Sequence, residues 1–348
     1  MRYDFGSDNT AGMAPEAMEA LAEANAGHVS AYGTDAVTAR AADAVRARLD
    51  ADAEVRFVFS GTAANAIALS MLARSFEAVA AHHAAHVCTD ETGAPGFFGH
   101  GVGLVGLPGL SGKIDLVGLE AILEEPEVGH RQPLAALSLT QATEYGAVYT
   151  VDELRKLIEP AKARGLGVHL DGARLANAAA AGFDLGQIAR IGVDVLVLGG
   201  AKAGAGCVEA LVLFDKSLAP RLDNRLKQAG QMSSKTRMLS APMLGLLESG
   251  AWDDRAAHAN LMAQRLADGI EGATRFVLAH PVDANIVFVR MPEEAHAALR
   301  GAGWACYRFD DGSVRFVCSW STTEATVDEL IAAIGAVGDT PGETPVHH

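Results

Sequence analysis

The stretches VHLDGARLANA (residues 168–178) and VLVLGGAKAGAGC (residues 195–207) decide the fold. Each begins as an apolar run and then changes to small and charged residues, which is the pattern of a buried strand that ends at the edge of a sheet. The first run leads into Asp171, and the second is followed by Lys202. Since ligands of open α/β sheets bind beyond the carboxyl ends of the strands, the two runs predict an acid and an amine at one binding edge.

An acid and a lysine placed in this way meet the needs of pyridoxal 5′-phosphate (PLP). The amine of Lys202 can hold the cofactor covalently, and the carboxylate of Asp171 can keep the pyridine nitrogen protonated so that the ring accepts electrons. Taken separately, Asp171 could be a helix cap and Lys202 a solvated loop charge. Their shared setting of glycines and small residues favours the cofactor site.

Strand and helix patterns alternate around these two stretches. A strand over Phe57–Phe59 precedes a helix over Ala63–Leu72, and a helix from about Val151 to Arg164 precedes the strand Gly167–Leu170. This alternation predicts an α/β fold with a mostly parallel sheet between helices. After about residue 255, short alternating strands joined by helices indicate a small α+β domain.

The chain of 348 residues is long enough for two hydrophobic cores. We expect a large domain with an amino-terminal segment over residues 1–254, a small carboxyl-terminal domain over 255–340, and a disordered tail over 341–348. A polar loop from about residue 221 is expected to lead into one long helix that continues to Leu266.

The composition excludes several classes of protein. A formal charge of −15 argues against nucleic acid as a partner. Charged residues interrupt every apolar run before it reaches about 18 residues, so no membrane span is expected. The first residues, MRYDFGSDNT, lack the apolar centre of a signal peptide, and the four cysteines show no CxxC spacing. We therefore expect a cytoplasmic enzyme that acts on a small molecule.

The turn Ser60-Gly61-Thr62 lies between a strand and a helix. The N–H groups of Gly61 and Thr62, together with the threonine hydroxyl, could bind an anion at the positive end of the helix. We assign the cofactor phosphate to this turn. An ordinary N-cap is the alternative reading.

Several histidines lie in one polar, glycine-rich region, among them His82, His83 and His86. Adjacent histidines on a strand or helix point in different directions, and no carboxylate stands where a zinc-binding helix needs one. We therefore predict no metal site. A histidine stacked on the cofactor ring is favoured, with Asp90 and Glu91 close behind it.

Two further polar residues are open to two readings. Ser7 could be part of a turn, or it could face a substrate carboxylate. Arg315 lies in the alternating segment SVRFVCSW, where an arginine is usually solvated. In a cofactor site it could instead hold a carboxylate through two parallel N–H bonds.

Six segments occur here in the same order as in the low-specificity threonine aldolases, fold-type I PLP enzymes related to the β-eliminating lyases. The segments are SGTAAN (60–65), AHVCTDETGAP (85–95), TQATEYGAVY (140–149), HLDGARLANA (169–178), GGAKAGA (199–205) and KQAGQMSSKTR (227–237). The chain resembles this family from about residue 4 to 320, and HLDGARL with its downstream lysine is the most specific signal. The resemblance implies the PLP-dependent aminotransferase-like fold, with a seven-stranded-type sheet.

The resemblance also implies roles for individual residues near the cofactor. Lys202 would bind PLP covalently and Asp171 would pair with the pyridinium nitrogen. Arg174 would lie near the ring hydroxyl or the substrate carboxylate. Gly61 and Thr62 would bind the phosphate. His86 would stack on the ring.

For the substrate, the resemblance implies that Ser7 and Arg315 hold the amino-acid carboxylate. Tyr32 and Lys227 would complete a site shared between subunits of a homodimer or homotetramer. Many family members carry a histidine near the substrate hydroxyl at the turn that matches Thr143. The segment TQATEYG has none, and we expect Thr143 itself beside the substrate.

The activity that this resemblance implies is that of a carbon–carbon lyase. Such an enzyme cleaves the Cα–Cβ bond of L-β-hydroxy-α-amino acids, such as threonine, allo-threonine or phenylserine, to glycine and an aldehyde. His86, or a water held by His86 and Glu91, is the candidate general base. One alternative is β-elimination at the same site, which would release pyruvate and ammonia. Another is a binding protein without catalysis, against which the retained Lys202, Asp171 and Arg174 argue.

Overall fold

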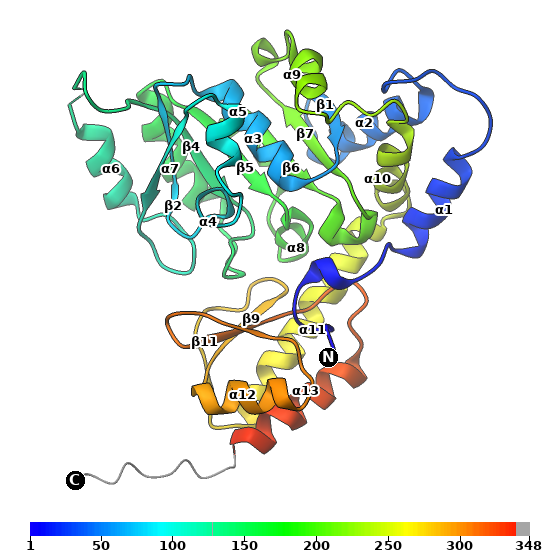
Figure 1. Ribbon diagram of the computed structural model, residues 1–348, viewed down its shortest axis with the longest axis vertical. Coiled ribbons are helices and arrows are strands. Elements are labelled where there is room, and N and C mark those ends of the chain that lie inside the picture. Colours follow the sequence, from blue (N-terminus) through cyan, green and yellow to red (C-terminus); the bar gives the residue numbers. More distant parts are fainter. Residues whose placement is uncertain (127, 339–348) are drawn as a thin grey trace.

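The computed structural model describes residues 1–126 and 128–338, which form two lobes with one sheet each (Figure 1). The large lobe holds a seven-stranded sheet of order β1-β7-β6-β5-β4-β2-β3. Its strands are β1 Glu54–Val58, β2 Ala78–His82, β3 Gly103–Leu107, β4 Leu134–Thr140, β5 Gly167–Gly172, β6 Val195–Gly199 and β7 Glu209–Leu213. The small lobe holds an antiparallel sheet of order β10-β11-β9-β8. Its strands are β8 Val277–Leu278, β9 Ile286–Arg290, β10 Tyr307–Arg308 and β11 Ser313–Val317.

Helices surround both sheets. In the large lobe they are α1 Pro15–Ala24, α2 Ala36–Leu49, α3 Gly61–Leu72, α4 His86–Thr89, α5 Ala94–Phe98, α6 Leu116–Glu124, α7 Val151–Ala163, α8 Leu175–Ala180, α9 Leu222–Gln228 and α10 Arg237–Ser249. Helix α11, Ala251–Ala273, runs from the large lobe to the small one, which also contains α12 Glu293–Gly301 and α13 Glu324–Gly338 (Figure 1). Short helical turns cover Asp8–Thr10, Leu185–Gln187, Ala201–Ala205 and Lys216–Leu218.

The direction of the strands decides where the functional groups meet. Strand β7 is antiparallel to both of its neighbours, β1 and β6, whereas the other pairs in the large sheet are parallel. The predicted mostly parallel α/β sheet is therefore confirmed. The amino end of β7 lies at the edge where β5 and β6 end, because Glu209 is paired with Gly199.

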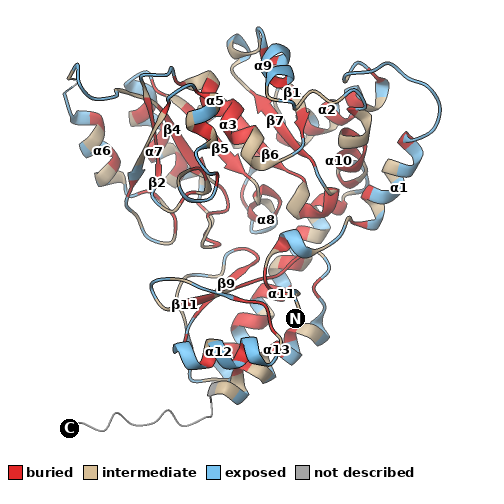
Figure 2. Ribbon diagram, in the orientation of Figure 1, coloured by how far each residue is buried: buried red, intermediate tan, exposed pale blue. Residues whose placement is uncertain are grey.

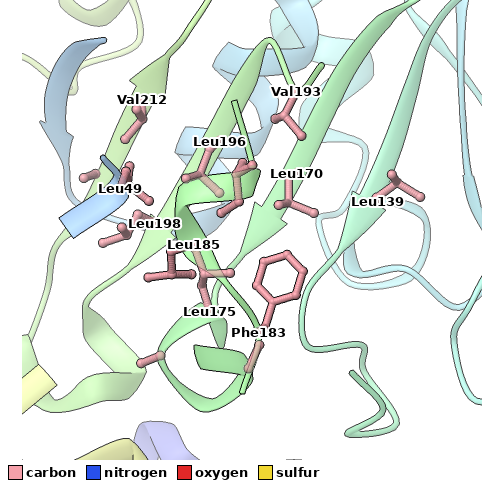
Figure 3. Packing of buried hydrophobic residues seen from close by; sticks show 14 of the residues in the cluster. Leu49, Leu139, Leu170, Leu175, Phe183, Leu185, Val193, Leu196, Leu198 and Val212 are labelled. Carbon is pink, nitrogen blue, oxygen red and sulfur yellow. The ribbon is translucent and has the colours of Figure 1, made fainter. Parts of the chain in front are cut away.

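The residues of β6 show how the large sheet is covered on both faces. Val195 and Val197 belong to one buried cluster, together with Ile67 of α3. Leu196 and Leu198 face the opposite layer, which Figure 3 shows packed with residues of α8 and the following loop. A strand buried on both faces is apolar throughout, which is why this stretch could be recognised in the sequence. Figure 2 shows the same distribution, with buried strands inside and helices exposed on their outer sides.

Local sequence signals set several helix boundaries. Helix α1 begins at Pro15, a residue that suits the first turn of a helix. Helix α7 begins with a capping box, in which the Thr150 hydroxyl accepts from the N–H of Glu153 and the Glu153 carboxylate accepts from the N–H of Thr150. The single long helix expected up to Leu266 is wrong, because Gly250, with a φ of 80°, separates α10 from α11.

The two lobes are connected by more than one segment. Helix α11 packs on α8 in the large lobe and on α13 in the small lobe. At the other end of the chain, Arg2 forms a parallel bridge with Trp304, and the buried Phe5 belongs to the core of the small lobe. The predicted domain boundary between residues 254 and 255 falls inside α11 and stays a prediction, and the predicted tail over 341–348 lies outside the described residues.

Within residues 1–126 and 128–338, no helix combines the length and the apolar character that are needed to cross a membrane.

Candidate active site

Asp171 and Lys202 meet at the edge of the large sheet. Strands β5 and β6 lie side by side in parallel register, with Asp171 opposite Val197. Asp171 occupies the penultimate position of β5, and Lys202 follows the end of β6 by a few residues. Their side chains interact electrostatically, and His86 interacts with both of them. The structure therefore brings these three predicted residues together.

The carboxylate of Asp171 is fixed on both sides. Its Oδ1 accepts a hydrogen bond from the N–H of Ala173 at 2.9 Å, and its Oδ2 accepts one from the Asn65 amide at 2.8 Å. Burial opposes ionisation of this group, but the nearby Lys202 and these hydrogen bonds hold its pKa below the ordinary value. Asp171 thus offers a rigid negative charge.

Lys202 lies in a tight turn of small residues, Ala201–Ala205. Burial lowers the pKa of Lys202, and the positive charge of Arg174 lowers it further. An amine with a lowered pKa is more often neutral and is a better nucleophile. The end of β6, just before this turn, is anchored by the buried Trp252, which donates from Nε1 to the carbonyl oxygen of Gly199 at 3.0 Å.

The amino end of α3 has the features that suit the binding of an anion. Ser60 is its N-cap, and the serine hydroxyl accepts from the N–H of Ala63 at 3.3 Å. The N–H groups of Gly61 and Thr62 lie in the first turn, where a helix supplies no acceptor. This helix is 12 residues long, so its dipole adds a favourable potential for a negative group.

His86 is oriented by a buried carboxylate. Its Nδ1 lies 3.0 Å from Oε1 of Glu91, and the same oxygen accepts from the Asn65 amide at 2.8 Å. The hydrogen bond to Glu91 raises the pKa of His86, whereas burial raises the pKa of Glu91. Because Nδ1–H donates to the carboxylate, Nε2 of His86 is left as the acceptor.

Arg174 is held by a residue that was not predicted. Its Nε and one Nη donate to the two carboxylate oxygens of Asp8 at 2.7 and 3.0 Å. Asp8 is buried, and it also accepts from the Asn285 amide at 3.0 Å. Asp8 therefore links the amino-terminal segment, the large lobe and the small lobe at the site.

Arg315 reaches the site from β11 of the small lobe. Its guanidinium lies 5.7 Å from the ring centre of Tyr307 and 5.5 Å from that of Phe309. Its Nε is buried and has no hydrogen-bond partner among the described residues. Burial and the charge of Arg174 lower the pKa of Arg315. A desolvated donor of this kind suits an anionic group such as a carboxylate.

The structure does not support a substrate contact for Thr143. This residue is fully buried, and its one hydroxyl proton goes to the carbonyl oxygen of Ser111 at 2.7 Å. The same hydroxyl accepts from the N–H of Ala147 at 3.1 Å. In the structure the threonine stabilises its own turn, and its contact with the substrate stays a prediction. The next residue, Glu144, accepts instead from the N–H of His86 at 2.8 Å.

The remaining predicted substrate residues have a different placement. The hydroxyl of Ser7 accepts from the N–H of Asn9 at 3.2 Å, so Ser7 caps a short turn next to Asp8. Tyr32 is half exposed, and Nζ of Lys227 lies 4.7 Å from its ring centre. The described contacts join Tyr32 and Lys227 to each other and not to the cluster around Lys202.

Four polar residues of the site were missed by sequence reasoning. They are Asp8, Asn65, Glu144 and Glu209. Asn65 had a usable signal, because it is the only amide in the otherwise small and apolar helix GTAANAIALSML. Asp8 and Glu144 adjoin the candidate residues Ser7 and Thr143, but only the fold shows which groups their carboxylates meet, and β7 brings Glu209 to the site.

The described residues contain no group of three or more His, Cys, Asp or Glu side chains that could hold a metal ion. Of the three histidines considered for such a site, His86 contacts Glu91, and the other two contact backbone carbonyl oxygens. Nε2 of His82 lies 3.2 Å from the carbonyl oxygen of Gly109, and Nδ1 of His83 lies 3.1 Å from that of Leu107.

The residues present fit PLP. An amine with a lowered pKa is present at Lys202, an ionised carboxylate at Asp171, and a helix terminus whose N–H groups at Gly61 and Thr62 have no acceptor within the helix. These three groups match the aldehyde, the ring nitrogen and the phosphate of that cofactor.

Comparisons with known proteins agree with this fit. The sequence model of the family described as "Beta-eliminating lyase" matches residues 4–294. A low-specificity L-threonine aldolase of a Pseudomonas species is 46% identical over 337 residues, which cover 96% of this chain and 97% of the relative. The solved threonine aldolase of Leishmania major is 31% identical, with a TM-score of 0.90, and the match covers 97% of this chain and 99% of that one. A histidinol-phosphate aminotransferase of Clostridium acetobutylicum, 12% identical with a TM-score of 0.74, shares the fold, over 95% of this chain and 97% of that one.

Proposed function

This chain belongs to the β-eliminating lyase family and is a PLP-dependent carbon–carbon lyase of the threonine aldolase type, and we propose that the cluster around Lys202 carries out its reaction. The enzyme cleaves the Cα–Cβ bond of L-β-hydroxy-α-amino acids to glycine and an aldehyde. The observation that carries the assignment of the site is the meeting of Asp171 and Lys202 at the edge of the sheet, next to the open end of α3.

Bound here, PLP supplies an electron-accepting ring for the charge that is released when the Cα–Cβ bond breaks. In our proposal, Asp171 fixes the ring nitrogen, Gly61 and Thr62 bind the phosphate, and Lys202 supplies the amine that holds the cofactor. The ionised state of Asp171 and the lowered pKa of Lys202 support these roles.

Arg315 is proposed to bind the carboxylate of the substrate. A guanidinium with a buried, unpartnered Nε gains an acceptor when a carboxylate arrives, which favours this role. Arg174 lies nearby, but Asp8 already occupies two of its donors. We therefore expect Arg174 to present its remaining N–H groups to the cofactor or substrate, and Ser7 to offer its hydroxyl from the adjoining turn.

His86 is proposed to remove the proton from the β-hydroxyl of the substrate. The proton moves from the hydroxyl oxygen to Nε2, either directly or through a water, while Nδ1–H stays bonded to Glu91. The carboxylate of Glu91 then stabilises the imidazolium that forms.

Replacing Glu91 should move the pH dependence of the reaction. Glu91 raises the pKa of His86, and His86 must be neutral to act as a base, so the rate rises as pH rises through that pKa. In Glu91→Gln the pKa of His86 falls, and the acid limb of the kcat/KM profile should shift to lower pH. The same change at Glu248, an exposed residue paired with Arg40, is the control. If the acid limb of the kcat/KM profile is unshifted in Glu91→Gln, Glu91 does not set the pKa of the catalytic base.

The products decide between this activity and β-elimination. With L-threonine, L-allo-threonine and both configurations of L-phenylserine, we expect glycine and the matching aldehyde in equal amounts. Release of pyruvate and ammonia would identify a β-eliminating enzyme instead. L-2-aminobutyrate, which lacks the hydroxyl, serves as the control and should give no aldehyde. The relative yields also measure which β-substituent this site prefers.

Tyr32 and Lys227 are proposed to complete the site of a second copy of the chain, in a homodimer or homotetramer. Their described contacts do not include the Lys202 cluster, and the ring of Tyr32 is half exposed, which supports a role outside their own subunit. A cytoplasmic location remains part of the proposal.

A further inference from the structure

Glu209 is a buried carboxyl group at the edge of the active site for which the reaction above has no use. It is the first residue of β7 and is paired with Val58 on one side and Gly199 on the other. Only 5% of its surface is exposed. Its Oε2 accepts from the N–H of Gly200 at 2.7 Å, directly before the turn that carries Lys202.

The other oxygen of Glu209 lies toward the anion-binding end of α3. A methyl group at Gly61 would stand 3.9 Å from Oε1 of Glu209. The turn GGAKAGA over residues 199–205 contains no hydroxyl or amide side chain. Besides the Thr62 hydroxyl, Glu209 therefore offers a polar side chain to a group bound at Gly61.

This arrangement places an acid beside the proposed phosphate position. A phosphate ester carries close to two negative charges at neutral pH. An ionised carboxylate a few ångströms away would repel it in a poorly solvated site. A protonated carboxyl group would instead donate a hydrogen bond to it.

The surroundings of Glu209 make the protonated form accessible. The charged groups that act on it are Lys202, after β6, and Asp171, in β5. Strand β1 and helix α3 present Val58 and Gly61 there, neither of which titrates. Burial raises the pKa of Glu209 to about 7, against the opposing effects of the Gly200 N–H, of Lys202 and of the Ala201 N–H.

We propose that Glu209 takes up a proton from water when a phosphate group binds at the end of α3, and that the resulting acid donates to a phosphate oxygen. This inference rests on the proposed function, because it assumes that the cofactor phosphate binds there. It makes Glu209 a cofactor-binding residue that couples cofactor binding to pH.

The direction of the effect follows from proton linkage. If binding requires a proton that the free protein has lost, affinity falls as pH rises above the pKa of Glu209 in the free protein. The fall approaches about tenfold for each pH unit, since one proton is taken up. Lys202 could take up a proton for the same reason, so the experiment must separate the two groups.

The test uses the full-length protein freed of cofactor and two probes. The first is 4′-deoxypyridoxine 5′-phosphate, which has no aldehyde and cannot react with Lys202. The second, 4′-deoxypyridoxine, has the same ring without the phosphate. Dissociation constants are measured by calorimetry from pH 7 to 9, in buffers with different ionisation enthalpies, so that proton uptake is counted directly.

For the phosphorylated probe, wild-type protein should lose affinity with rising pH and take up close to one proton, and Glu248→Gln should behave in the same way. Glu209→Gln keeps an acceptor for the Gly200 N–H and should bind with much less dependence on pH. If Glu209→Gln fails to fold, Lys202→Met removes the other titrating group and should still take up the proton.

An unchanged slope in Glu209→Gln, or no uptake in Lys202→Met, would overturn the role of Glu209. A wild-type slope equal for both probes would do so too. Wild-type protein that binds neither the probe nor PLP at any pH would instead contradict the cofactor site itself, so the two failures can be told apart.

Discussion

Lys202→Ala protein should lose the visible absorbance of bound PLP and fall in activity by about 10³-fold or more, as happens when a covalent catalytic group is removed. No other lysine replaces it, because the turn Ala201–Ala205 holds this side chain against Asp171 and Arg174. Borohydride treatment of the wild-type protein, followed by mass spectrometry of its peptides, should place the added cofactor mass on Lys202.

The control is Lys156→Ala, an exposed lysine on α7, which should keep both absorbance and activity. Retention of the covalent cofactor in Lys202→Ala, or a modified peptide that lacks Lys202, would contradict the assignment. Circular dichroism should show that the variant is folded, since Lys202 makes no contribution to either hydrophobic core.

Asp8→Ala should destabilise the protein by about 3–5 kcal/mol, the usual cost of leaving one partner of a buried ion pair uncompensated. The Arg174 side chain is 12% exposed and that of Asp8 is 1% exposed, so neither charge can turn to water. Because a folded domain is stable by only about 5–15 kcal/mol, this is a large part of the total. Chemical denaturation measures the effect.

The matched control is an ion pair of similar geometry on the surface. Asp328 accepts from Arg265 through both oxygens at 2.8 Å, but both side chains are well exposed. Asp328→Ala should therefore change stability very little. The double variant Asp8→Ala with Arg174→Met should recover part of the lost stability, since it removes the buried charge. Equal effects of the two aspartate substitutions would show that burial of the Asp8 pair does not matter.

The sequence was sufficient to predict the local structure around candidate residues whose strand or turn lies in one continuous segment. One apolar run in the sequence predicts the strand that leads to Asp171, and a second apolar run predicts the strand that precedes Lys202. The Ser60-Gly61-Thr62 turn can be read because a strand and a helix flank it. In each case the residues that define the local structure are the neighbours of the functional residue in sequence.

The sequence was not sufficient where function depends on contacts between distant segments. Asp8 and Arg174 are hydrogen-bonded in the structure but lie 166 residues apart in the sequence, and no motif near either residue indicates the other. In the sequence, Glu209 is a single charged residue at the start of a strand. Only the antiparallel pairing of β7 with β6 places it beside the end of β6. The hydrogen bond from Thr143 to Ser111 could not be foreseen for the related reason that Ser111 comes from another loop.

The placement of the amino-terminal segment has a practical consequence. Phe5 fills the core of the small lobe and Arg2 extends along Trp304, while Asp8 neutralises Arg174. Proteolytic removal of the first eight residues would therefore leave a cavity in the core of the small lobe and also remove the carboxylate that pairs with Arg174. An affinity tag attached through a short rigid joint would strain the same contacts, so a long flexible spacer is the safer choice.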